Sequence, residues 1–151
     1  INNFCVTEEI RSQEISSIVS KISSIEEIRE FLVNEQRRIG DSGGLVAEGR
    51  DIGTTVFPNA DLKIFLTASI DERAKRRQSE LEIRGSKEID FNQLKELIRK
   101  RDFEDSNREI SPLKKAKDAI EIVTDSYSIN EVVDKIVDIY NFRIPKEIQN
   151  E

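Results

Sequence analysis

Short apolar runs that do not alternate with polar residues are the strongest constraint on the fold of this chain. Three such runs, "LVAE" at 45–48, "LKIFLTA" at 62–68 and "AIEIVT" at 119–124, are separated by segments with helical periodicity. Strands that are apolar on both faces belong to parallel sheets, because helices connect such strands and cover the sheet. A length of 151 residues suits one domain, and the pattern of apolar runs predicts an α/β fold with a parallel sheet and flanking helices.

Capping signals place the helices around these strands. Residues 7–39 predict two helices, the second opened by Ser24 and Glu27, and the glycine-rich "GDSGG" at 40–44 is a strong break. Three further helices each begin with a capping residue followed three positions later by Glu or Gln: Ser69 with Glu72 up to about Gly85, Asp90 with Gln93 up to about Arg108, and Ser128 with Glu131 up to about Tyr140.

The composition excludes several classes of function. The absence of histidine and a single cysteine, Cys5, exclude His-based catalysis, Cys/His zinc centres and an internal disulfide. The formal net charge is −6, so attraction of the whole protein to nucleic acid or to an anionic membrane is not expected. The sequence contains no dedicated acidic metal cluster, no signal peptide and no apolar run of membrane length, which favours a cytoplasmic protein.

Ionic residues follow the first apolar run, in "VAEGRDIG" at 46–53. Glu48, Gly49, Arg50 and Asp51 fall where that strand is expected to end. Open parallel sheets bind ligands beyond the carboxyl ends of their strands, glycine admits a ligand close to the backbone, and arginine holds phosphate with two parallel hydrogen bonds. A turn with a solvated ion pair explains the same residues equally well.

The helix expected at 90–108 carries a stripe whose chemistry changes along its length. Its positions are spaced by threes and fours and therefore share one face. A solvated face would be polar from its start, whereas this stripe begins as core, so the charges need buried partners. An ion network within the helix is one explanation, and a bound anion explains the surplus arginine better. In order, the stripe reads Phe91, Leu94, Ile98, Arg101, Asp105 and Arg108.

A basic segment occupies residues 71–85. Taken alone, such a segment is most often a solvated helix face, and it lacks the interleaved aromatic residues of a nucleic-acid site. Beside a phosphate site it would serve as a mobile cationic lid. Its basic residues are Arg73, Lys75, Arg76, Arg77 and Arg84.

Successive segments of the chain, from its start to about Tyr140, resemble bacterial cytidylate kinases. The most specific segments are "LVAEGRDIGTTVFP" at 45–58 and "RDFEDSNR" at 101–108. Members of that family transfer the γ-phosphoryl group of ATP, with Mg²⁺, to CMP or dCMP. The resemblance therefore implies a fold of the P-loop nucleoside monophosphate kinase type, with ATP and CMP or dCMP as small-molecule partners.

The resemblance also implies roles for individual residues. Arg50 would hold the phosphate of the acceptor nucleotide, and Arg50 and Asp51 are the residues it assigns to catalysis. Four residues would read the edge of the cytosine base: Ser20, Arg29, Asp51 and Arg108. A carboxylate that accepts from the cytosine amino group would favour C over U, which has a carbonyl there.

The remaining roles concern the sugar and the ATP phosphates. Arg101 and Asp105 would contact the sugar of the acceptor. Arg73, Arg76 and Arg77 would belong to a lid over the ATP phosphates, which would cover about 73–88. Phosphoryl transfer requires mostly positioning and charge neutralisation, which arginines and Mg²⁺ supply without histidine.

The 151 residues contain no Gly-x-x-x-x-Gly-Lys phosphate loop, because every glycine lies between Gly40 and Gly85. We therefore expect an incomplete sheet, lacking the first strand and the phosphate loop of such kinases, and a chain that is inactive alone and partnered by its missing N-terminal segment. The expected divisions are the end of the nucleotide-binding insert with the following helix at 1–39, the kinase core at 40–141, and a loose tail at 142–151.

Three functional interpretations follow. The first is an ATP-dependent (d)CMP kinase to which this chain contributes the acceptor site and lid. The second is a remnant that binds nucleotide without catalysis. The third is a helical interaction domain whose basic segment at 73–84 binds an acidic partner.

Overall fold

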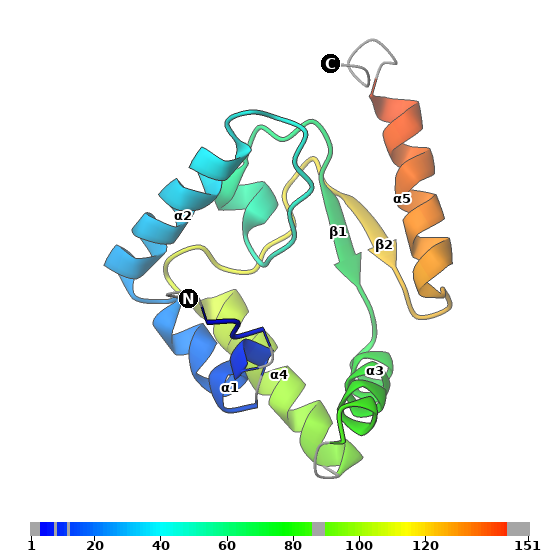
Figure 1. Ribbon diagram of the computed structural model, residues 1–151. Coiled ribbons are helices and arrows are strands. Elements are labelled where there is room, and N and C mark those ends of the chain that lie inside the picture. The colour runs from blue at the N-terminus through cyan, green and yellow to red at the C-terminus, as the bar shows by residue number, and fades with distance from the viewer. Residues whose placement is uncertain (1–3, 8, 12, 86–89, 145–151) are drawn as a thin grey trace.

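The computed structural model describes residues 4–7, 9–11, 13–85 and 90–144, apart from a few side chains near the start of the chain. From residue 64 onward two strands are separated by two helices and followed by a third, as expected for an α/β fold (Figure 1). In chain order the elements are the 3-10 turn η1 (Glu9–Arg11), α1 (Gln13–Ile22), α2 (Glu26–Gly40), the π-helical turn η2 (Ile52–Val56), β1 (Ile64–Thr67), α3 (Ile70–Ile83), α4 (Phe91–Asn107), β2 (Ile120–Val123) and α5 (Ile129–Arg143).

The strands β1 and β2 form a parallel pair, with Ile64 opposite Ile120 and Thr67 opposite Val123. Helices α3 and α4 make the crossover between them, which is the connection that parallel neighbours require. The parallel α/β prediction is therefore confirmed. Coverage of both sheet faces is not found in the described residues, because Leu66 and Val123 remain 51% and 56% exposed.

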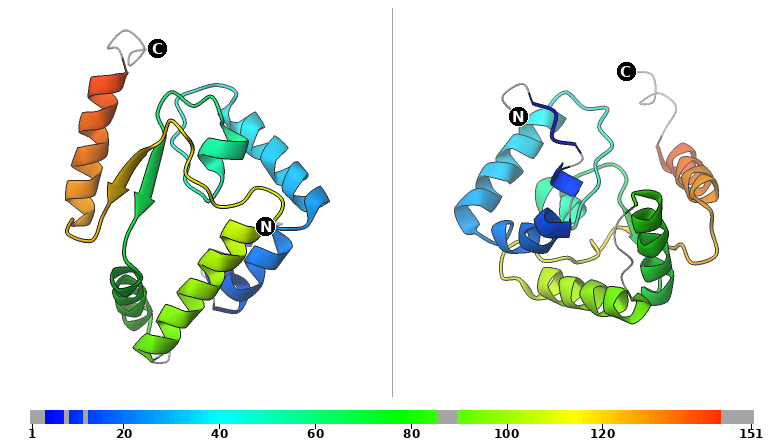
Figure 2. Two further views of the ribbon diagram at one scale, coloured as in Figure 1. Left: turned by 180° about the vertical axis from the view of Figure 1, so that it is seen from behind. Right: turned by 60° about the horizontal axis from the view of Figure 1, so that its bottom comes forward.

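The hydrophobic core lies where α3 meets α4. Ala74 and Leu81 of α3 pack with Leu94 of α4, and Phe91 and Ile98 border this cluster. Both views of Figure 2 show the two helices meeting at one end. The apolar half of the predicted stripe is thus confirmed as an inward face. Of the charged positions that continue it, Asp105 is buried and Arg101 stays half-exposed.

The prediction of a strand at 45–48 is wrong. These residues have no regular structure, and Val46 is 98% exposed. A strand is defined by hydrogen bonds to a neighbouring strand, and the described residues offer none beside this segment. Apolar composition alone therefore does not make this segment a strand.

The capping box predicted at Ser24 is also wrong. The N-cap of α2 is Ile25, without a side-chain hydrogen bond. The Ser24 hydroxyl donates instead to the Lys21 carbonyl at 2.8 Å, which satisfies an acceptor at the end of α1. The connection between α1 and α2 is so short that Ser24 serves the helix before it.

The other helix limits agree with the sequence signals. Ser69 accepts from Glu72 N, Asp90 accepts from Asn92 N and Gln93 N, and Ser128 and Glu131 form a reciprocal capping box. Gly85 has φ of +63°, a left-handed conformation that favours glycine after a helix. Helix α5 continues to Arg143, past the expected end at Tyr140 and into the segment predicted as a loose tail, of which 145–151 lie outside the described residues.

Across the described ranges, no helix combines the length and the apolar character needed to cross a lipid bilayer.

Replacing Ser128 with alanine removes the cap of α5. Because the hydroxyl accepts from Glu131 N and the Glu131 carboxylate accepts from Ser128 N, the change should lower the free energy of unfolding by about 1 kcal/mol. Urea unfolding followed by circular dichroism measures it. Ser126→Ala, at a neighbouring exposed position, is the control and should have little effect. Equal losses in the two variants would contradict the capping role.

Candidate functional site

The segment after residue 48 folds into a π-helical turn. The Asp51 carbonyl accepts from the amides of Thr54, Thr55 and Val56 at 3.3, 2.8 and 3.3 Å, and Val56, 1% exposed, anchors the turn. Turns with π geometry are rare and are often found at functional sites. This turn fixes the backbone of Asp51 and, with it, the neighbouring Arg50.

Helix α2 lies against this turn (Figure 1) and brings Arg29 to Asp51. Arg29 Nη2 donates to Asp51 Oδ2 at 2.5 Å, and the two side chains are only 9% and 3% exposed. Arg29 Nε is also buried and has no hydrogen-bond acceptor among the described residues. A buried guanidinium nitrogen is costly without an acceptor, so the geometry leaves a donor for one more group.

The Asp105 carboxylate forms ion pairs with three arginines. Its Oδ2 lies 3.2 Å from Arg50 Nε and 3.8 Å from Arg101 Nε, and its Oδ1 lies 3.9 Å from Arg108 Nη1. The carboxylate is 2% exposed, although Arg50 and Arg101 keep 38% and 45% of their side chains open to solvent. The predicted ion network within α4 is present, and Arg50 joins it from a distant part of the sequence.

The two groups of ion pairs are adjacent, because Arg50 and Asp51 are chain neighbours. Four guanidinium groups and two carboxylates leave two positive charges uncompensated. Since Arg50 and Arg101 are half-exposed, the excess charge is accessible. The arrangement can therefore hold a dianion such as a phosphate monoester against planar, bidentate donors.

The structure gives less information on Ser20. Its backbone lies in α1, which packs beside α4 (Figure 2), but its side chain lies outside what the structure describes. Its role in base recognition thus stays a prediction.

The arginines assigned to the lid lie on α3 and are paired with carboxylates. Arg73 binds Asp102 of α4 through two hydrogen bonds of 3.0 and 2.5 Å, and Arg77 donates to Glu80 at 2.7 Å. Residues 70–83 form a regular helix, whereas 86–88 of the predicted lid lie outside the described residues. Such pairing makes the segment less suited to be the free basic face that the interaction-domain interpretation requires.

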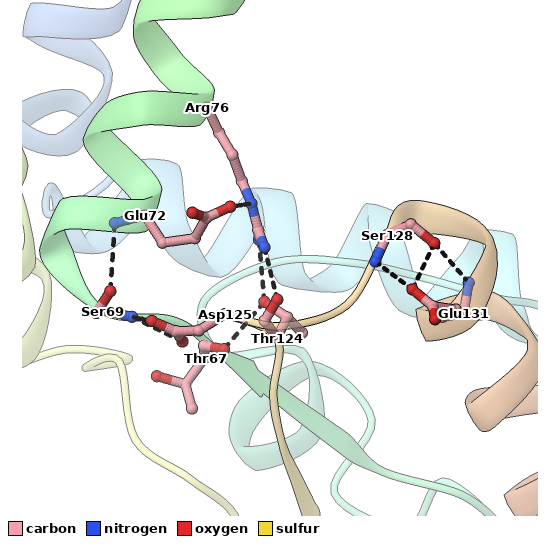
Figure 3. A network of polar contacts seen from close by, with 8 residues as sticks. All are labelled: Thr67, Ser69, Glu72, Arg76, Thr124, Asp125, Ser128 and Glu131. Atoms are coloured by element: carbon pink, nitrogen blue, oxygen red, sulfur yellow. Dashed lines mark hydrogen bonds and ion pairs between the residues drawn. The ribbon is translucent and has the colours of Figure 1, made fainter.

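Arg76 connects α3 by hydrogen bonds to the carboxyl end of β2 (Figure 3). Its guanidinium donates to the Thr124 hydroxyl and carbonyl at 2.9 and 2.7 Å and to Glu72 at 2.8 Å. The Thr124 hydroxyl in turn donates to the Thr67 carbonyl at 3.1 Å. Sequence reasoning missed Thr124, although a polar residue directly after an apolar strand was an available signal.

Asp125 was missed as well. Both of its carboxylate oxygens accept from Ser69 N at 3.0 Å, which joins the end of β2 to the start of α3 (Figure 3). These hydrogen bonds from Ser69 hold the pKa of Asp125 below its ordinary value. Asp125 is therefore a structural acceptor at the edge where α/β proteins bind ligands.

The described residues contain no group of three or more His, Cys, Asp or Glu side chains placed to hold a metal ion.

Comparison with known proteins identifies the family. The family model described as cytidylate kinase matches residues 1–142. The chain belongs to the cytidylate kinase family. It is 84% identical, over its whole length, to 30% of the bifunctional pantoate ligase/cytidylate kinase of Prochlorococcus marinus subsp. pastoris (strain CCMP1986 / NIES-2087 / MED4).

Proteins with the same name in other organisms also match this chain. The relative in Prochlorococcus marinus (strain NATL1A) is 54% identical over 98% of this chain and 29% of its own length. The relative in Trichormus variabilis (strain ATCC 29413 / PCC 7937) is 52% identical over 95% of this chain and 27% of its own length. The chain thus spans less than a third of these cytidylate kinase relatives, whose names also include pantoate ligase.

Replacing Asp105 with asparagine leaves three arginines around a neutral, buried side chain. We expect a loss of about 3 kcal/mol in the free energy of unfolding, because the guanidinium groups then repel one another without compensation. Added sulfate should recover more stability in this variant than in the wild type, since an anion replaces the lost charge. Thermal unfolding with and without sulfate measures both effects. Glu109→Gln, an exposed change next to Arg108, is the control, and equal sulfate effects in both variants would contradict the charge argument.

Asp125→Asn tests the hydrogen bonds from Ser69 through their pH dependence. A carboxylate whose pKa is lowered by folding stabilises the protein above its unfolded-state pKa, and this contribution disappears as the pH falls through the folded-state value. The wild type should therefore exceed the variant in stability at pH 6 to 7, and the difference should shrink below about pH 4. Denaturant unfolding across this range measures it, with the exposed α5 change Asp134→Asn as control. A difference that stays constant down to pH 3 would count against the assignment.

Proposed function

We propose that the protein containing this chain transfers the γ-phosphoryl group of ATP to CMP or dCMP, and that this chain supplies the acceptor site. Membership of the cytidylate kinase family supports the reaction class. The observation that carries the proposal is the cluster of ion pairs around the neighbouring carboxylates of Asp51 and Asp105. In this cluster the arginines exceed the carboxylates by two positive charges. A nucleoside monophosphate has the two features this arrangement suits, a dianionic phosphate and a hydrogen-bonding base.

Arg50 would bind the acceptor phosphate. Its Nε lies against Asp105 at 3.2 Å, which fixes the orientation of the guanidinium plane. The remainder of its donor fork is accessible, because the side chain is 38% exposed. A guanidinium held by a buried carboxylate loses less side-chain freedom when phosphate binds, so the site is preorganised.

Asp51 and Arg29 would recognise the base. An ionised carboxylate only accepts hydrogen bonds, so Asp51 would accept from the cytosine amino group and repel the carbonyl that uracil has there. Arg29, fixed by Asp51, would donate from its unsatisfied Nε to a base acceptor. Ser20 and Arg108 complete the proposed base contacts.

The sugar and the ATP side involve the remaining residues. Arg101 and Asp105 would contact the ribose, and Arg73, Arg76 and Arg77 would form the lid after leaving their present carboxylate and carbonyl partners. Mg²⁺, bound to the phosphates of ATP, would supply charge neutralisation during transfer. An oxygen of the CMP phosphate would form a bond to the γ-phosphorus as the bond from that phosphorus to the ADP oxygen breaks, which yields CDP and ADP.

Two variants test the proposal in the full-length gene product. Arg50→Met should lower kcat/KM for CMP by about a hundredfold or more, because it removes a preorganised donor to the phosphate. Arg99→Met, an exposed change elsewhere on α4, is the control and should retain activity. ADP formation with CMP as acceptor, together with calorimetric titration of CMP, provides the measurement.

The same assay with UMP tests the role of Asp51. Asp51→Asn should reduce the preference for CMP over UMP about tenfold or more, since an amide presents a donor as well as an acceptor. An unchanged preference would contradict the proposed base contact. Binding of CMP without any phosphoryl transfer by the wild type would instead favour a nucleotide-binding protein without catalysis.

A further inference from the structure

Arg37 binds the C-terminal end of η2, the π-helical turn whose N-cap is Asp51. It lies on α2, and its guanidinium donates to the Val56 carbonyl at 3.0 Å through Nε and to the Thr55 carbonyl at 2.7 Å through Nη2. None of the roles assigned above uses this residue. The two contacts span 18 and 19 residues of sequence and are therefore tertiary contacts.

The carbonyls that Arg37 binds are those that a turn leaves without partners. The last carbonyl groups of a helical turn have no amide ahead of them to accept from, and η2 is only five residues long. Within η2, the Asp51 carbonyl accepts three amides and the Ile52 carbonyl accepts Phe57 N at 2.7 Å. Arg37 supplies charge-assisted donors to the two carbonyls at the end, which stabilises this uncommon geometry.

The same face of α2 holds both ends of the turn. Arg29, Val33 and Arg37 are spaced by four residues, so they follow one face of the helix. Arg29 binds the Asp51 carboxylate at the first end, Val33 is buried at 7% exposure, and Arg37 binds the carbonyls at the second end. The turn is thereby fixed to one rigid helix by two guanidinium groups.

We propose that Arg37 is a positioning residue for the acceptor site, which acts through η2 and Asp51 and has no contact with the nucleotide. This inference rests on the proposed function, because it assigns the residue that keeps Asp51 aligned with the base. Without Arg37, the turn can relax toward ordinary α or 3-10 hydrogen bonding. Asp51 and Arg50 then shift together, since the Asp51 carbonyl is the hub of the turn.

The experiment measures discrimination between CMP and UMP in the full-length gene product. The measured quantity is the ratio of kcat/KM for CMP to kcat/KM for UMP. Arg37→Met keeps the length of the side chain and removes its donors. The matched control is Arg38→Met, since Arg38 is the next residue, its side chain is 70% exposed and its partner is Glu35 on the same helix. Arg37→Met should lower the ratio about fivefold or more, as expected for coupled neighbours, and Arg38→Met should leave it unchanged.

A double-mutant cycle separates positioning from general damage. In the background of Asp51→Asn the ratio is already reduced, so adding Arg37→Met should change it by less than twofold. An equal further loss in that background would overturn the proposal, as would an Arg37→Met ratio equal to that of Arg38→Met. If Arg37→Met does not fold, Arg37→Lys against Arg38→Lys decides the question, because the single nitrogen of an ammonium cannot reproduce the two separated nitrogens, Nε and Nη2, through which Arg37 donates. A lowered ratio for Arg37→Lys alone supports the proposal, and equal ratios overturn it.

The wild-type result distinguishes failure of the proposed function from failure of the positioning role of Arg37. A wild type that neither binds nor phosphorylates CMP overturns the proposed function and, with it, the role of Arg37. A wild type that discriminates normally, beside Arg37 variants that match their Arg38 controls, overturns only the positioning role.

Discussion

The arrangement of the candidate site depends on the buried carboxylate of Asp105. This residue is 2% exposed and faces Arg50 from the loop after residue 48, Arg101 from its own helix and Arg108 directly after that helix. A buried carboxylate is tolerated only with compensating positive charge, and the same requirement draws the loop toward α4. The core between α3 and α4 fixes the helix, and Asp105 fixes the loop to that helix. In the proposed function, folding and ligand recognition therefore depend on the same contacts.

The charge balance is the reason for proposing a nucleotide as the ligand of this site. Each carboxylate of the site orients an arginine, yet two positive charges stay uncompensated. Orienting an arginine in advance reduces the conformational freedom lost when an anion binds, while the surplus charge supplies the attraction. The 151-residue chain carries a net charge of −6, so the attraction is local. A local site of this kind favours a small anion over a polyanion.

The sequence predicted the parallel strands at 62–68 and 119–124, three of the four capped helices, and the inward stripe on α4, because these depend on local chemistry and periodicity. It placed Arg50 and Asp51 near Arg101 and Asp105 only through family resemblance and the rule for strand ends. It failed at 45–48, where strand formation depends on a neighbour that no local pattern reveals. It could not find Asp125 or Arg37, because each binds backbone groups from elsewhere in the chain, and it missed Thr124 although a polar residue directly after an apolar strand was a signal.

The stripe on α4 changes from packing to charge within a single helix, and this sets two different tolerances to substitution. In its first half, Leu94 and Ile98 fill volume, so other aliphatic side chains of similar size should be accepted as relatives diverge. In its second half, Arg101, and Arg108 directly after the helix, form ion pairs with the buried carboxylate of Asp105, and lysine would replace these guanidinium groups poorly. The rate of accepted substitutions should therefore be higher in the first half of α4 than in the second.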